Sequence, residues 1–241
     1  MLALVLSVAA AAPCEVMLDA RPVRQHGGRC LAAASAAALS ARGATLDPAE
    51  MADDLPLGKL GEDPYDLQEA LRPRGWDTLV FEGSPEHGAR LVEAGFSPVL
   101  LVDEAGTPHA VAVVGVRRVQ APDSRCVGAP AALALADPRT GSVAWVSASE
   151  LKRQQYRTRM LVSFEPTAWS ALDDAGFPLE GATRQDRRYR SESLMRRATE
   201  RPSPDAQSVA LLERAVATDP AWPVPRALLD VHKHALVDPP P

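Results

Sequence analysis

The chain has 241 residues, of which 46% are hydrophobic and 24% charged, and a formal net charge of −5. This length allows one sizeable domain with an appendage, or two small domains. The negative charge leaves no basic footprint for nucleic acid, and the glycines form no phosphate-binding pattern, so nucleic-acid partners and nucleotide chemistry are not expected.

The N-terminal segment has the character of an export signal. Met1 to Ala12 is apolar and ends in three alanines, as signal peptides do before their cleavage site, and it is too short for a stable membrane span. Two features are atypical, because no Lys or Arg precedes the apolar run and Pro13 lies at the expected cleavage site. We expect residues 1–14 to direct export to the periplasm or the extracellular space. A membrane anchor at Cys14 and a cytoplasmic location are the alternatives.

Three cysteines, Cys14, Cys30 and Cys126, have neither a metal-ligand spacing nor the pattern of a disulfide framework. If Cys30 is a working thiol, Cys14 and Cys126 either pair with each other or remain two free thiols, and the sequence leaves both open. No metal ion or organic cofactor is implied.

The first elements are predicted to be helices. Gly27 and Gly28 interrupt structure, and residues 31–39 are nearly all Ala and Leu, which predicts a helix that begins at Cys30 and stops at Gly43. Asp47-Pro48 and Asp63-Pro64 each combine an N-cap with proline at the first helical position, so two further helices are expected. Residues 56–63, between them, are predicted to be a loop.

After Trp76 the pattern changes to short apolar runs separated by turns, which is typical of strands. Two of these runs, joined by a glycine-bearing turn at residues 104–107, predict a hairpin whose faces are both buried. The expected strands are residues 78–81, 98–102, 109–116, 131–136, 143–146 and 160–164, with helices at 85–94 and 149–154. Helices first and an antiparallel sheet second indicate the α+β class.

Beyond Pro166 the chain becomes charged and helical. The arginine-rich residues 184–201 are predicted to be one solvated helix, and Asp205 to cap another that carries an apolar stripe. A third helix is expected over residues 222–236. Residues 210–220 resemble the second helix of a tetratricopeptide repeat, although only one to one and a half repeats fit. We expect this tail to pack on the first domain or on a protein partner.

Four residues suggest nucleophilic chemistry. Cys30 lies in the first turn of its helix, where free N–H groups and the helix dipole favour a thiolate. His109 opens a strand, so it can act as general base and acid, and Asp137 ends a later strand, where it can orient the imidazole. The Gln25 amide can join the Cys30 N–H as an oxyanion donor. Taken singly, each residue also fits an ordinary structural role.

The joint order of these residues resembles papain-like cysteine peptidases, in particular the bacterial family related to the double-glycine-leader peptidases that process bacteriocins. The first motif is Gln25, five residues before Cys30. The second is the family's His-x-x-Val-Val-x-Gly strand, which residues 109–115 match approximately as His-Ala-Val-Ala-Val-Val-Gly. Asp-Pro-x-x-Gly follows over residues 137–141, and Ser-x-x-Glu-Leu over residues 147–151. The match covers roughly residues 22–166.

This resemblance implies a papain-like fold in which Cys30 is the nucleophile, His109 the base and acid, Asp137 the orienting group and Gln25 the oxyanion donor. It also implies a peptide or protein substrate. The sequence departs from the family at Leu31, where a glycine is expected, and at Arg29, where a neutral or acidic residue is more usual. The Leu31 side chain could crowd the substrate cleft, whereas the Arg29 guanidinium would favour the thiolate.

Three hypotheses therefore compete. The first is a cysteine peptidase-like hydrolase; the second is a catalytically inactive papain-like domain that binds a peptide or protein, with the helical tail as docking surface. The third is a plain α+β domain in which the motif match is coincidental. We expect a peptidase-like domain over residues 15–166 and a helical, tetratricopeptide-like tail over 167–241.

Overall fold

The computed structural model describes residues 14–58, 61–104, 107–120, 126–154, 159–174 and 176–237. The expected export segment up to residue 13, and the centre of the predicted turn at residues 104–107, lie outside the described residues.

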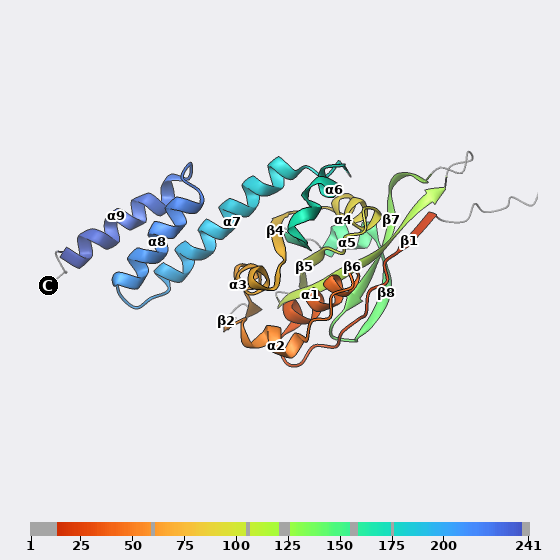
Figure 1. Cartoon of the computed structure of the whole chain (residues 1–241), viewed down its shortest axis with the longest axis horizontal. Coiled ribbons are helices and arrows are strands. Elements are labelled where there is room, and N and C mark those ends of the chain that lie inside the picture. The colour runs from red at the N-terminus through yellow and green to blue at the C-terminus, as the bar shows by residue number, and fades with distance from the viewer. Residues whose placement is uncertain are drawn as a thin grey trace, which may run out of the picture.

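One antiparallel sheet of seven strands forms the centre of the molecule (Figure 1). Six strands follow the order β4-β9-β5-β6-β7-β8, and β1 pairs with β6 beside them. Their bounds are β1 Cys14–Met17, β4 Asp77–Glu82, β5 Val99–Glu104, β6 Thr107–Gln120, β7 Cys126–Asp137, β8 Ser142–Ser147 and β9 Arg159–Phe164. All the strand pairs are antiparallel, and the α+β class predicted from the sequence is confirmed.

Strand β6 is the longest strand and has neighbours along both edges. Its first half pairs with β5, placing His109 opposite Val102, and its second half pairs with β1, placing Arg118 opposite Cys14. The other edge pairs with β7. The apolar residues of β6 belong alternately to two buried clusters, so both faces of the sheet are covered, as its weak alternation predicts.

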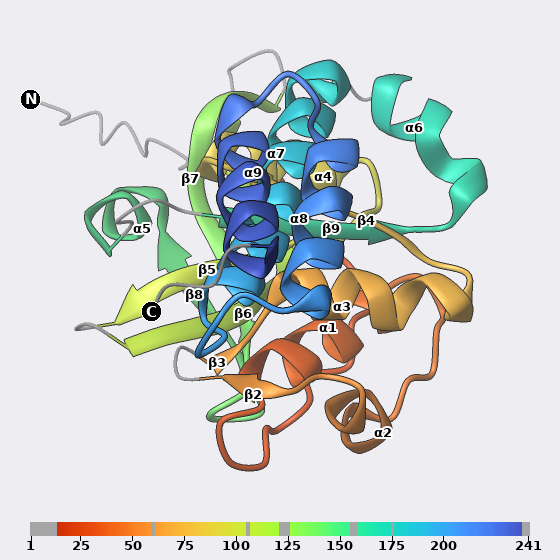
Figure 2. The ribbon, with the colours of Figure 1, turned by 90° about the vertical axis from the view of Figure 1, so that its left-hand side faces the viewer.

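Helices cover the two faces of this sheet separately (Figure 2). One face carries α1 (Cys30–Ser40), α2 (Pro48–Asp53) and α3 (Pro64–Leu71), whereas α4 (Pro85–Glu93) and α5 (Ala148–Gln154) lie on the other. The predicted caps are present, because the carboxylate of Asp47 accepts from the N–H of Ala49 at 2.8 Å and that of Asp63 accepts from Tyr65 at 3.0 Å.

Three parts of the chain differ from the sequence-based prediction. The expected loop over residues 56–63 contains a two-stranded ribbon of β2 (Leu57–Gly58) and β3 (Gly61–Glu62). Strand β1, the 3-10 turn Pro166–Ala168 and helix α6 (Trp169–Asp174) were not predicted either. Two-residue strands are too short to show a hydrophobic period, so no local pattern predicts them.

A disulfide joins Cys14 and Cys126, which are 112 residues apart in sequence. It connects the first residue of β1 to the first residue of β7, at the same end of the sheet. Of the two arrangements that the sequence leaves open, the structure therefore has the paired one.

Three helices, α7 (Leu179–Thr199), α8 (Ala206–Thr218) and α9 (Pro223–Val237), extend from this body in Figure 1. The prediction that the arginine-rich helix is solvated is wrong, because α7 covers the outer edge of the sheet. The carboxylate of Asp186 accepts from the N–H of Val80 in β4 at 2.9 Å, and Arg190 donates to the carbonyl of Thr78 at 3.0 Å. Polar side chains that pair with an open strand edge can be buried without an apolar stripe.

The remaining helices follow the prediction closely. Asp205 caps α8 by accepting from the N–H of Ser208 at 2.7 Å, and Leu212 of α8 packs with Leu229 of α9. The tetratricopeptide-like character of this tail, and the boundary between it and the preceding domain, remain predictions. Among the described residues, no helix combines the length and apolar character that a membrane crossing requires.

Candidate active site

His109 and Asp137 are in direct contact. A hydrogen bond of 2.9 Å joins His109 Nε2 to Asp137 Oδ1, and the imidazole is only 1% exposed. The turn after β7 holds the carboxylate in place, since Oδ1 also accepts from the N–H of Arg139 at 2.8 Å. Gly141 closes this turn at φ 67°, a conformation that glycine adopts without strain, and donates to the Asp137 carbonyl.

Cys30 is the first residue of α1, as predicted, and is partly buried. The backbone N–H of Ala110, the residue that follows His109 in β6, acts on the thiol and lowers its pKa. Because the other two cysteines form the disulfide, Cys30 carries the free thiol of the chain. The structure thus brings Cys30 to the strand that carries His109.

The protonation of Cys30 differs from the expectation. Burial raises the pKa of the thiol, and the negative charge of Glu62 raises it further. Hydrogen bonds from the N–H groups of Ala110 and Cys30, and the charge of Arg139, act in the opposite direction but do not outweigh these effects. The helix N-terminus therefore does not give the thiolate the advantage that the sequence suggested.

Burial is the main cause, and the second group that raises the pKa is Glu62, which was not among the predicted site residues. Its Oε2 accepts from the N–H groups of Leu31 at 2.9 Å and Ala32 at 3.1 Å, so the first turn of α1 is capped from β3. The side chain is fully buried, and burial raises the pKa of this carboxyl. A cap that comes from 31 residues along the chain has no local sequence signal.

The two residues that depart from the family pattern both have partners within the fold. Arg29 donates to the carbonyl of Leu55, and its guanidinium lies 3.6 Å from Oε1 of Glu62. Leu31 is 2% exposed and belongs to the hydrophobic cluster beneath the sheet. Its side chain therefore fills the core.

Gln25 is tied to the Asp137 turn through its backbone, whose N–H donates to the carbonyl of Pro138 at 2.8 Å. Its side-chain Nε2 donates to the carbonyl of Gly27 at 2.8 Å, and its Oε1 is buried without a hydrogen-bond partner. Gly27 adopts φ 60°, which explains the glycine in this loop. The loop before Cys30 and the turn after β7 thus lie side by side.

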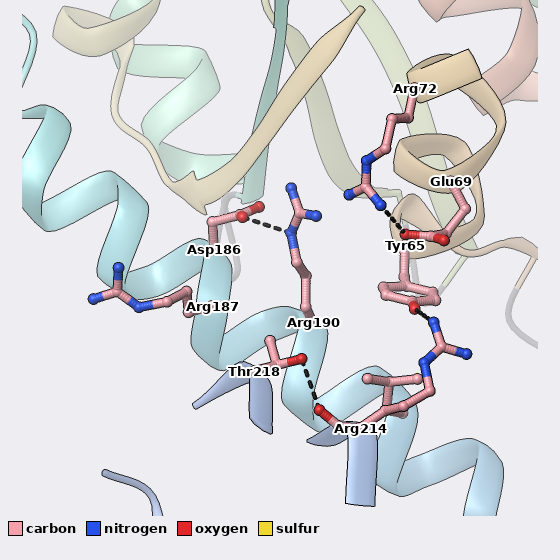
Figure 3. A pocket seen from close by; sticks show the side chains of 9 residues that line it. Tyr65, Glu69, Arg72, Asp186, Arg187, Arg190, Arg214 and Thr218 are labelled. Carbon is pink, nitrogen blue, oxygen red and sulfur yellow. Dashed lines mark hydrogen bonds and ion pairs between the residues drawn. The ribbon is translucent and has the colours of Figure 1, made fainter. Parts of the chain in front are cut away.

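A pocket of about 330 Å³ lies elsewhere, between α3 and the C-terminal helices (Figure 3). Most of its charged groups are already paired: Arg72 with Glu69 at 3.1 Å and Arg190 with Asp186 at 2.6 Å. Figure 3 also shows Arg214 of α8 reaching Tyr65 of α3, at 2.8 Å. This pocket marks the junction between α3 and the tail. No group of three His, Cys, Asp or Glu side chains suited to a metal ion occurs in the part of the chain that the structure describes.

In this fold a cysteine opens a helix that packs on an antiparallel sheet, and a histidine and an aspartate lie on neighbouring strands. The solved structures that are similar to this chain include two peptidase structures. One is a double glycine motif protease from an AMS/PCAT transporter in complex with the leader peptide, at 14% identity and a TM-score of 0.44 over 62% of this chain and 98% of that one.

The other is the peptidase domain of Streptococcus ComA, a bi-functional ABC transporter involved in a quorum-sensing pathway. The identity is 15% and the TM-score 0.44, over 58% of this chain and 95% of that one. No protein-family model and no curated protein matches the chain.

Proposed function

We propose that this chain is a cysteine peptidase-like hydrolase that cleaves peptide bonds through Cys30, His109 and Asp137. One observation carries the proposal. His109 of β6 and Asp137 of β7 form a hydrogen-bonded pair, and the N–H of Ala110, the next residue in β6, acts on the Cys30 thiol. The proposed nucleophile, base and orienting group therefore belong to three separate elements, α1, β6 and β7.

In the proposed reaction, His109 takes the thiol proton and the Cys30 sulfur attacks the peptide carbonyl carbon. Asp137 accepts the hydrogen of Nε2 and so leaves Nδ1 as the base. The N–H of Cys30 and the Gln25 amide stabilise the oxyanion. The C–N bond breaks as His109 returns the proton to the leaving amine, and water then hydrolyses the thioester to the carboxylic acid and the free thiol.

We include in the proposal a peptide or protein substrate and a protein partner at the C-terminal helices, where α9 exposes Val231 by 62%. Export is supported by the bond between Cys14 and Cys126, because disulfides persist in oxidising compartments. That bond also occupies the Cys14 sulfur that a lipid anchor would need, which favours an exported form without such an anchor.

A second candidate is the inactive papain-like domain that binds a peptide or protein. One observation favours it: the pKa of the Cys30 thiol is raised, mainly by burial. A raised pKa leaves less of the reactive thiolate.

The test is cleavage of a mixed peptide library, followed by mass spectrometry, with the disulfide-intact chain. Cys30→Ala and His109→Ala should each lower the cleavage rate at least about 100-fold, and Asp137→Asn should also lower it. His26→Ala, which removes an exposed histidine from the loop before Cys30, is the matched control and should leave the rate unchanged. Cleavage that persists in Cys30→Ala, or no cleavage by the folded wild type, would contradict the peptidase and favour the binding module.

A further inference from the structure

The first turn of the nucleophile helix is held by a carboxylate from outside the helix. Glu62 of β3 accepts from the N–H groups of Leu31 and Ala32, at 2.9 and 3.1 Å. The first N–H groups of a helix have no partner within it, and an anion bound there also offsets the positive end of the helix dipole. Cys30 belongs to the same turn, so Glu62 acts against a negative charge on its sulfur.

The surroundings of Glu62 are unfavourable for a carboxylate. The side chain is fully buried, and Oε1 has no hydrogen-bond partner; its nearest cation is Arg29, at 3.6 Å. A buried polar atom that lacks a hydrogen bond is unfavourable. The N–H groups of Leu31 and Ala32 and the guanidinium of Arg29 hold the carboxylate itself, and the chain on either side of Glu62 fixes its backbone.

Asp63, the next residue, shows what fixes the backbone at Glu62. Asp63 caps α3, and its carboxylate also accepts from the hydroxyl of Tyr189, from Ser193 Oγ at 2.7 Å and from the guanidinium of Arg196. All three of these donors belong to α7. Asp63, whose carboxylate binds α7, is thus the direct neighbour in the chain of Glu62, whose carboxylate caps the Cys30 helix.

We propose that Glu62 is a positioning residue of the nucleophile and that helix α7 sets its place through Asp63. While α7 is docked, Glu62 stays on the first turn of α1 and opposes the Cys30 thiolate; movement of α7 away from Asp63 releases Glu62 and lets the thiolate form. The inference rests on the proposed function, because only a nucleophile needs such control. It gives the C-terminal helices a role in controlling the thiol.

The experiment measures the rate of Cys30 alkylation by iodoacetamide against pH, on the full chain with its disulfide intact. Glu62→Gln keeps an oxygen for the two N–H groups and removes the charge, so the apparent pKa of Cys30 should fall by about one unit. Arg139, whose charge lowers the pKa of Cys30, and the His109–Asp137 pair are unchanged in this variant. Glu69→Gln makes the same chemical change on α3 and should leave the pKa of Cys30 where it was.

A second arm tests α7. Tyr189→Phe combined with Ser193→Ala removes two hydrogen bonds to Asp63 without changing the net charge. The pKa of Cys30 should fall in the same direction, and adding Glu62→Gln should lower it no further, because both changes act through one carboxylate. If Glu62→Gln does not fold, the α7 variant, which keeps Glu62, still tests whether the pKa of Cys30 depends on the contacts of α7 with Asp63.

An unchanged Cys30 pKa in folded Glu62→Gln would overturn the role of Glu62. An unchanged pKa in the α7 variant, or fully additive effects, would overturn the role of α7. Because alkylation reports on the thiol itself, these results do not depend on peptide cleavage. A shifted pKa without any cleavage would count against the peptidase alone, whereas cleavage with an unshifted pKa would count against the positioning role alone.

Discussion

Replacing Leu31 by glycine, the residue that the resembled family carries after its cysteine, should destabilise the protein and not activate it. Leu31 is 2% exposed and packs in the cluster between α1 and the sheet. Truncating a buried leucine to alanine costs about 3–5 kcal/mol, and glycine in a helix adds up to about 1 kcal/mol. The expected loss is about 4–6 kcal/mol, a large part of the stability of an ordinary domain.

Urea unfolding followed by circular dichroism measures this loss. Ala32→Gly, in the same turn and equally buried, is the matched control and should cost only about 1–2 kcal/mol. Leu31→Ala should fall between the two variants. A loss below about 1 kcal/mol for Leu31→Gly, together with faster peptide cleavage, would refute the reasoning and place the Leu31 side chain in the cleft.

Three further predictions concern the disulfide, a buried carboxylate and two glycines. Replacing both Cys14 and Cys126 by serine opens a loop closed across 112 residues and should lower the free energy of unfolding by about 4–5 kcal/mol, measured in guanidinium; an unshifted midpoint would contradict this. Burial alone would raise the pKa of Asp63, but the hydrogen bonds it accepts hold the pKa below 3.8. The ionised carboxylate therefore stabilises the fold above pH 3.8. In thermal melts, the difference in stability between wild type and Asp63→Asn should shrink as the pH falls through the lowered pKa of Asp63. A difference that is constant with pH would argue against this role of Asp63. In Gly115→Ala the new Cβ would collide with Met17 of β1 and lie 2.9 Å from Ala134 Cβ of β7, which should lower the free energy of unfolding by about 1–3 kcal/mol. Gly181→Ala, in open space on α7, should raise it by up to about 1 kcal/mol. Equal effects of the two variants in chemical unfolding would count against the close strand contact.

The parts of the fold that the sequence predicts are those with a local cause. The caps at Asp47, Asp63 and Asp205 each act within three residues, and the helix from Cys30 follows from its alanine run. The contact between His109 and Asp137 could be anticipated because both residues lie next to turns at the ends of apolar strands.

The missed parts depend on residues far apart in the chain. Glu62 lies in a segment that reads as a loop, and its contact with α1 spans about thirty positions. Likewise, nothing in the arginine-rich α7 shows that Asp186 will pair with the edge of β4. The raised pKa of Cys30 follows from burial and from Glu62, so the local helix-terminus argument was incomplete without the tertiary structure.

The pairing of β6 with three other strands affects the order in which the molecule unfolds. Ala112, Gly115 and Val116 have paired strands on both edges, and both faces of β6 are covered by packed side chains. Their amide hydrogens can exchange with solvent only when the whole sheet comes apart. Helices α8 and α9 share a much smaller buried cluster, and local opening is enough to expose them. The strand that carries His109 is therefore the last part of the chain to open, and the helical tail is among the first.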